Sequence, residues 1–470
     1  MRTAISPQIL STTASLCPVC LSRIPATREQ VGETVFLVKQ CPEHGSFRTV
    51  IWRGSIPFSS WLRAKRTSAL QKTFTAVNRG CPFDCGLCPG HGQHTCTALI
   101  EITQRCNLHC PICFADAGNT DTAEDPSLTQ IDFLYERIMT ASGPCNIQLS
   151  GGEPTVRDDL PAIISLGKSK GFNFIQLNTN GLRLAREVGY ALSLQEAGLS
   201  SVFLQFDGLE PDTHLALRGR DLRAIKEQAL QHCQAAGLAV VLVPTLVPGI
   251  NTHEIGAILD YAIRFAPTVR GVHFQPVSYF GRFPEAPADQ DRLTLPELLQ
   301  LISAQSGGAI TPDHFAPPAC EHALCSFHGN FLIKESGHLL PLGNPQTTCC
   351  STGEGPAIIP SALEGREKSV AFTARQWSLP SLPMASVRST AEDEKTAQPQ
   401  DDLDLFLARA RTHTFSISAM AFQDVWNLDL ERLQGCCIHV ISPAGNLIPF
   451  CAYNLTSNMG TPLYRGVGPR

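Results

Sequence analysis

Three cysteines stand close together in the stretch EITQRCNLHCPICFADAG, residues 101–118. They are Cys106, Cys110 and Cys113, and they directly follow a strand-like run. A [4Fe–4S] cube has four irons, so a loop that offers three thiolates leaves one iron open to a substrate or cofactor. A structural zinc site would need a fourth protein ligand, and three buried thiols without metal are the other alternative. We predict the cluster because neighbouring segments favour it.

Two segments that follow later strand-like runs, LSGGEPT and LQFDG, indicate a pocket beside this loop. Gly151 and Gly152 allow the backbone to approach a ligand closely. Glu153 and Asp207 could meet amine or hydroxyl groups of that ligand. Each segment alone would be an ordinary turn, but the combination with the cysteine spacing predicts a ligand site.

The segment CPFDCGLCPGHGQHTC just before the first of these strands carries a full set of four thiolates. Such a set suits a closed [4Fe–4S] cluster, and tetrahedral Zn²⁺ is the alternative. His91 and His94 are spare candidates. A cluster at this place could pass electrons towards the three-cysteine loop. The predicted ligands are Cys81, Cys85, Cys88 and Cys96.

Near the N-terminus, two ligand pairs flank a short strand-like run. This arrangement is typical of a zinc-ribbon or rubredoxin-like knuckle, in which one metal ion replaces the hydrophobic core that about sixty residues cannot build alone. We predict a structural site, and the sequence leaves Zn and Fe open. Its ligands would be Cys17, Cys20, Cys41 and His44.

The C-terminal region holds a further group of cysteines that could form a second closed cluster. His322 and His439 are ligands or plain neighbours of that group. Cys145 and Cys233 are isolated thiols, for which a buried apolar role is the default. The predicted ligands are Cys320, Cys325 and Cys451 together with Cys437 or its neighbour Cys436.

The elements that must position these residues follow a regular rhythm between residues 98 and 290. Strand-like runs alternate there with helix-like segments, which predicts an α/β fold with a parallel sheet, either an open stack or a partial barrel. Beyond 290 the pattern is less regular, and 374–403 reads as a flexible linker. The expected strands are 98–103, 146–150, 174–179, 201–207, 240–247 and 271–277.

Composition sets outer limits on function. The chain has 470 residues, 43% of them hydrophobic and 17% charged, and a net charge of −5. These values are typical of a globular protein, and the net charge gives no indication of a basic surface for nucleic acid. We see no signal peptide and no apolar run of about 18 residues that would span a bilayer. We therefore expect a soluble cytoplasmic protein whose nineteen cysteines stay mostly reduced.

CNLHCPIC followed by Phe114, the GGEP segment and the strand rhythm resemble the radical S-adenosylmethionine (SAM) superfamily over about 98–290. The resemblance implies a partial (β/α)6 barrel of the TIM type, with SAM chelating the open iron of the cluster at the three-cysteine loop. It also implies that the following residues contact SAM: Gly151, Gly152, Glu153, Pro154, Thr179, Asn180, Gln205 and Asp207.

The order of the cysteine segments resembles a narrower branch, the tetraether lipid synthase group and its bacterial relatives. The resemblance implies several iron–sulfur clusters, a mononuclear metal, and metal-binding extensions on both sides of the barrel. The predicted regions are 1–60 for the metal knuckle, 61–97 for the auxiliary cluster, 98–290 for the barrel, and 291–470 for the substrate and second auxiliary-cluster region.

This branch has been linked to the coupling of lipid chains and to the methylation of a pterin precursor. We predict carbon–carbon coupling of lipid chains, with pterin methylation as the alternative. The implied partners are SAM, the lipid or pterin substrate, a donor of the ferredoxin or flavodoxin type, and a membrane surface touched peripherally. A multi-cluster electron carrier without SAM chemistry is a third reading, which the three-ligand loop disfavours.

Overall fold

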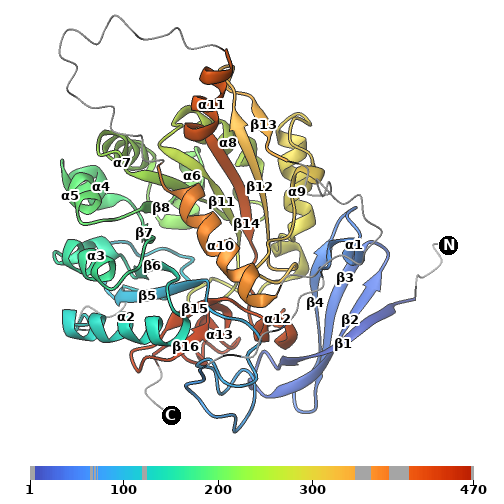
Figure 1. The fold of residues 1–470 in the computed structure, drawn as a ribbon. Helices are drawn as coiled ribbons and strands as arrows, with labels where there is room; N and C mark the ends of the chain where they lie inside the picture. The colour runs from blue at the N-terminus through green and yellow to red at the C-terminus, as the bar shows by residue number, and fades with distance from the viewer. Residues whose placement is uncertain are drawn as a thin grey trace, which may run out of the picture.

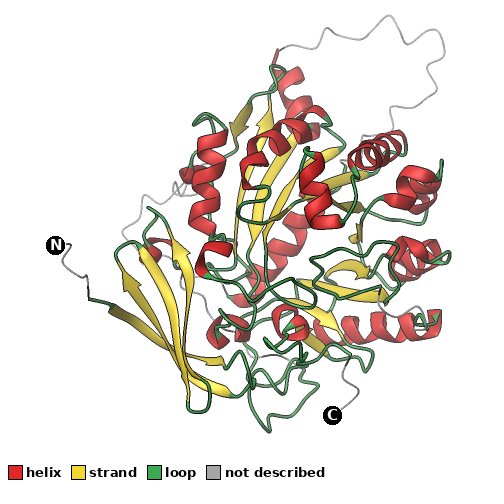
Figure 2. Ribbon diagram, turned by 180° about the vertical axis from the view of Figure 1, so that it is seen from behind, coloured by secondary structure: helices red, strands yellow, loops and turns green. Residues whose placement is uncertain are grey.

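The computed structural model describes residues 6–63, 67, 70, 72–118, 124–343, 361–379 and 402–466. It contains a small four-stranded sheet and a large sheet of 12 strands. The small sheet stands to one side of the large one, and helices flank the large sheet (Figures 1 and 2).

The small sheet is an antiparallel meander in which consecutive strands pair. It is docked on the C-terminal part of the chain by Lys39, which is buried and donates to the Ser15 hydroxyl and to the carbonyl oxygens of Leu16 and Val425. The strands are β1 (Gln8–Leu16), β2 (Arg23–Val31), β3 (Thr34–Cys41) and β4 (Gly45–Arg53).

The six predicted strands form the parallel centre of the large sheet, which confirms the α/β fold and its partial barrel. Each lies within a few residues of its predicted position. They are β5 (Thr97–Thr103), β6 (Asn146–Gly151), β7 (Ile175–Thr179), β8 (Ser201–Gln205), β9 (Ala239–Val243) and β11 (Val269–Pro276), with the short β10 (Thr245–Leu246) beside β11.

The two faces of these strands differ in polarity. On β6, Ile147 and Leu149 are fully buried in the hydrophobic core, whereas the alternate residues Gln148 and Ser150 line a cavity. Successive side chains of a strand point to opposite faces, so one face packs on helices and the other stays polar.

The helices that cover the apolar face are amphipathic. On α2 (Leu128–Ser142), the residues Ile131, Leu134, Tyr135 and Ile138 recur at helical spacing and are buried in the same core. The others are α3 (Leu160–Ser169), α4 (Leu182–Arg186), α5 (Tyr190–Glu196), α6 (Pro211–Arg218), α7 (Arg223–Ala235), α8 (Ile255–Arg264) and α9 (Leu295–Gln305).

The C-terminal region, which appeared irregular in the sequence, adds strands to both edges of the sheet. β14 is parallel to β11 and β15 is parallel to β5, and β12, β13 and β16 follow antiparallel. Among the described residues, the end strands β13 and β16 do not pair with each other, so the barrel is open. The strands are β12 (Ser326–Ile333), β13 (Leu339–Pro341), β14 (Thr414–Met420), β15 (Ile438–Ile441) and β16 (Leu447–Pro449).

One C-terminal helix, α10 (Ala362–Trp377), crosses the sheet in front of β11 and β14 (Figure 1) and also contacts β6 and β9. The linker predicted at 374–403 is therefore helical where it begins, and α11 (Asp402–Thr412) starts before its predicted end. The residues between, 380–401, lie outside the described part of the chain. The remaining short helices are α1 (Phe58–Trp61), α12 (Leu430–Gln434) and α13 (Phe450–Asn454).

Within the described ranges, no helix has both the length and the apolar composition that crossing a bilayer would require.

Candidate functional site

A cavity of about 690 Å³ lies between the polar face of the large sheet and α10. The three cysteines of the loop after β5 border it. Most of the residues predicted to contact SAM border it too, namely Gly151, Gly152, Glu153, Thr179, Asn180 and Gln205. The fold thus brings the predicted cluster loop and the predicted cofactor residues to one cavity.

The cysteine loop is held by the segment that follows β11. Cys113 and Arg282 exchange two backbone hydrogen bonds of 3.0 and 2.9 Å, and the Arg282 guanidinium Nε donates to the Cys110 carbonyl oxygen at 3.0 Å. Burial raises the pKa of the Cys106 thiol to about 12. A metal cluster would offset this cost because its positive charge stabilises thiolates, so these buried thiols fit a [4Fe–4S] cluster.

Gly151 and Gly152 pack directly against the start of that loop. Gly151 has a φ of +131°, and a Cβ at Gly151 or Gly152 would overlap the carbonyl oxygen of Thr103 or Arg105. The Gly152 amide donates to the Thr103 carbonyl oxygen at 2.9 Å, and the Glu153 amide donates to that of Arg105 at 2.9 Å. We expected these glycines to allow the close approach of a ligand. The structure shows that they allow the close approach of the chain's own backbone at Thr103 and Arg105.

Glu153 is buried, and its carboxylate accepts hydrogen bonds from several groups of the protein. It accepts from the hydroxyls of Thr155 and Thr179, each at 2.6 Å, and from the Asn180 amide at 2.7 Å. Asn180 in turn donates through Nδ2 to Asn107 Oδ1 at 2.7 Å, within the cysteine loop. Glu153 therefore fixes the ends of β6 and β7 relative to the cluster loop.

Asp207 and Pro154 are not among the residues that border the cavity, and their predicted contacts with SAM stay predictions. Asp207 is fully buried and accepts two hydrogen bonds of 2.6 Å from Arg218. Burial would raise the pKa of Asp207, but the Arg218 guanidinium outweighs it and the pKa lies below its usual value. Pro154 starts a buried 3₁₀ turn, Pro154–Val156, and points no side chain into the cavity.

Arg218 is a site residue that the sequence analysis missed. It borders the cavity, and its side chain donates to the Ile112 carbonyl oxygen at 3.5 Å, between two cluster cysteines. No short sequence motif surrounds Arg218. The only signal in the sequence is that it follows Asp207 by eleven residues. The other missed residues that border the cavity lie on strands of the predicted barrel, such as Asn178, Phe203 and His273, and on elements beyond it, including α10.

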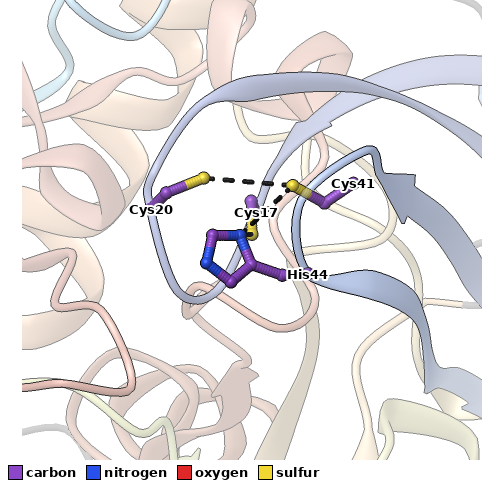
Figure 3. A group of neighbouring side chains, drawn as sticks. All are labelled: Cys17, Cys20, Cys41 and His44. Carbon is purple, nitrogen blue, oxygen red and sulfur yellow. Dashed lines mark hydrogen bonds between the residues drawn. The ribbon is translucent and has the colours of Figure 1, made fainter.

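The four predicted ligands of the N-terminal knuckle converge at one end of the small sheet (Figure 3). The Cys20 and Cys41 sulfurs are 4.0 Å apart, and His44 Nδ1 lies 3.7 Å from Cys17 Sγ and 3.4 Å from Cys41 Sγ. Ligands about 2.3 Å from a tetrahedral metal lie about 3.8 Å apart. These donors therefore fit one mononuclear metal ion.

The fold regroups the other cysteines. Cys96 lies with Cys320 and Cys437, its sulfur 2.9 Å from that of Cys437, and not in a common group with Cys81, Cys85 and Cys88. The reason is strand pairing, because β15 lies beside β5 and places Ile438 opposite Thr97. The four-thiolate cluster predicted in the segment before β5 stays a prediction, and the structure favours a different partner set for Cys96.

The predicted C-terminal set is divided for the same reason. Cys325 and Cys451 border a second, small cavity together with Cys436, while Cys320 belongs to the group of Cys96. Arg432 donates to the Cys325 sulfur at 3.3 Å, and the Gln423 amide donates to the Cys451 sulfur at 3.2 Å. Cys437 borders this small cavity and also lies with Cys96 and Cys320, so the choice between Cys436 and Cys437 stays open.

Cys145 and Cys233 are buried. Of the candidate histidines, His91 and His439 face each other with 3.1 Å between their Nε2 atoms. His94 and His322 each have an interaction within the chain.

Two family models match this chain. The radical SAM superfamily matches residues 100–262, and the "HMPTM N-terminal zinc ribbon domain" matches residues 9–53. Among solved structures, Streptococcus suis SuiB shares 14% identity at a TM-score of 0.37 over 46% of each chain.

Two curated proteins show how far the similarity extends. The chain is 36% identical to 7,8-dihydro-6-hydroxymethylpterin dimethyltransferase of Methanocaldococcus jannaschii, over 94% of this chain and 93% of that one. It is 33% identical to a probable GTP 3′,8-cyclase of Methanothermobacter thermautotrophicus, over 36% of this chain and 55% of that one. The chain therefore belongs to the radical SAM superfamily of enzymes, which use a [4Fe–4S] cluster and SAM, and within it to the family of the M. jannaschii pterin dimethyltransferase.

Proposed function

We propose that this enzyme methylates a pterin precursor, with 7,8-dihydro-6-hydroxymethylpterin as the first substrate to test. The observation that carries the proposal is the 36% identity to the M. jannaschii dimethyltransferase along 94% of the chain. The match of residues 9–53 to the zinc ribbon model supports it, because that region lies outside the barrel that radical SAM enzymes share. These comparisons favour our alternative reading over lipid coupling.

The cluster and SAM supply, when bound, a radical able to remove hydrogen from unactivated C–H bonds. The protein's part is to position the ligands and exclude water. Arg282 and Arg218 bind backbone carbonyl oxygens of the cluster loop, and Glu153 anchors the neighbouring strand ends. α10 covers the cavity from the side opposite the sheet. Exclusion of water protects a reactive intermediate from side reactions.

We assign the SAM-binding cluster to Cys106, Cys110 and Cys113, and the SAM contacts to the predicted residues that border the cavity. Auxiliary clusters would use the regrouped cysteines, and the knuckle would hold Zn or Fe. A low-potential donor of the ferredoxin or flavodoxin type would supply the electron. Location in the cytoplasm stays a prediction.

The test is an anaerobic assay of the reconstituted protein with dithionite, 7,8-dihydro-6-hydroxymethylpterin and SAM, which serves here as the source of both the radical and the methyl group, with the products separated by mass spectrometry. We expect 5′-deoxyadenosine and pterins heavier by one or two CH₂ units. The Cys113→Ala protein, reconstituted in parallel, should give neither product.

Two results would contradict the proposal. Formation of 5′-deoxyadenosine with no change in the pterin would exclude this substrate, and modified lipids in a host that expresses the gene would revive the coupling reading. No cleavage of SAM by a protein with intact clusters would favour the electron carrier.

A further inference from the structure

One part of the cavity is lined by aromatic rings that have no role in holding the cluster loop. Phe203 on β8, His273 on β11 and Trp377 at the end of α10 all border the cavity. The ring centroid of Phe203 lies 5.3 Å from that of His273 and 5.3 Å from that of Trp377. These distances leave no room for a further ring between the three side chains. A planar ligand would therefore lie against the face of the aromatic cluster that borders the cavity.

Polar groups without partners surround this aromatic cluster. Asn178 is paired with Phe203 in the ladder between β7 and β8, and its Oδ1 atom is buried without a hydrogen-bond partner among the described residues. The same holds for His328 Nδ1 and for the Ser326 hydroxyl, both on β12. All three residues border the cavity. A buried polar atom without a partner is costly, so this group points to a ligand that would satisfy it.

The two histidines belong to one row across three strands. Ser418 on β14 is paired with His273 on one side and with His328 on the other, and its hydroxyl lies 2.9 Å from His273 Nδ1. Burial lowers the pKa of His273 to about 4, and it also lowers the pKa of His328. Both rings are therefore neutral near pH 7, and each offers a donor or an acceptor but no charge.

The aromatic rings and the unpaired polar atoms together discriminate among ligand classes. A lipid chain would cover the aromatic rings but leave the polar atoms of Asn178, Ser326 and His328 unpaired. An uncharged planar nitrogen heterocycle presents both a face for the rings and an edge of N–H, C=O and ring nitrogen groups for the polar atoms. The pterin ring and the adenine of SAM both belong to this class.

We propose that Asn178, Phe203, His273, His328 and Trp377 form the binding site for the pterin ring of the substrate. The assignment rests on the proposed function, and it deepens that function by separating the substrate end of the cavity from the cluster loop. The adenine of SAM is the competing occupant. Its predicted contacts, Gly151 to Glu153 with Thr179, Asn180 and Gln205, lie at the carboxyl ends of β6, β7 and β8 instead.

The experiment measures binding of 7,8-dihydro-6-hydroxymethylpterin and of SAM separately, by anaerobic equilibrium dialysis on the reconstituted protein. Asn178→Leu and His328→Phe keep the side-chain shape and remove the polar atoms, and Trp377→Ala removes a ring. Asn173→Leu and His253→Phe, at exposed positions outside the cavity, are matched controls. Iron content and circular dichroism verify that each protein is folded and loaded.

We expect the Kd for the pterin to rise about tenfold or more in each cavity variant, with the Kd for SAM within about twofold of wild type. Unchanged pterin binding would overturn the assignment. Weakened SAM binding with unchanged pterin binding would also overturn it and would give the site to adenine. A wild-type protein that binds SAM but neither binds nor methylates the pterin would overturn the proposed function together with this site.

Discussion

The N-terminal knuckle and the loop after β5 are both built from closely spaced cysteines, yet the fold uses them in opposite ways. In the knuckle, all four donor atoms lie within 4.8 Å of one another at the end of a small sheet. In the loop, the three cysteines border a cavity of about 690 Å³. A closed donor set stabilises structure, and an open one leaves a metal position for chemistry. The spacing of cysteines alone therefore does not distinguish a structural site from a reactive one.

The strongest test of this comparison removes one ligand from the loop. Cys113→Ala should abolish formation of 5′-deoxyadenosine, because the cluster that binds SAM needs all three thiolates. The metal of the knuckle should stay bound. Iron and zinc analysis combined with chromatography of the nucleoside products measures both. Cleavage at the wild-type rate would refute the assignment of the loop.

The next largest effect is expected for Asp207→Asn, which leaves the buried Arg218 without its carboxylate partner. Loss of one partner of a buried ion pair costs about 3 to 5 kcal/mol, and Arg218 would shift beside the cluster loop. We expect a lower free energy of unfolding in anaerobic denaturation and slower SAM cleavage. Asp221→Asn, which breaks an exposed ion pair with Arg223, is the matched control and should change neither quantity noticeably.

Gly152→Ala should have a smaller but clear effect. Its Cβ would collide with the Arg105 carbonyl oxygen, so the GGEP segment would move away from the cluster loop. We expect SAM to bind about tenfold more weakly, with a loss of about 2 kcal/mol in stability. Equilibrium dialysis with labelled SAM measures the first quantity. Gly435→Ala is the control for an added methyl group, since Gly435 has a φ of −94° and the nearest atom to a Cβ there is 3.8 Å away.

The smallest effect on SAM cleavage is expected from the knuckle itself. Cys41→Ala should release the metal ion from the small sheet and lower its thermal stability, because the metal replaces a core. The rate of SAM cleavage should stay within about threefold of wild type, since no knuckle ligand borders the cavity. A loss as large as that of Cys113→Ala would show that the two sites are coupled, contrary to the comparison.

The predicted fold was most accurate where the signal is local. The strand predicted at 98–103 corresponds to β5, Thr97–Thr103, and the strand predicted at 146–150 corresponds to β6, Asn146–Gly151. The role of Glu153 was only partly foreseen, because two of its hydrogen bonds come from Thr179 and Asn180, which lie 26 and 27 positions away in the sequence. The strands β12, β14 and β15 were not predicted, since their short runs show little periodicity beyond residue 290.

The sequence by itself determined the three-cysteine loop, the knuckle and the rhythm of parallel strands, because each depends on residues near one another in the chain. Only the tertiary structure decided that Cys96 belongs with Cys437, 341 positions away, and that α10 closes a cavity over the sheet. Contacts over such separations depend on which strands pair at the sheet edges. That pairing is settled by packing of the whole sheet, and no local pattern of residues encodes it.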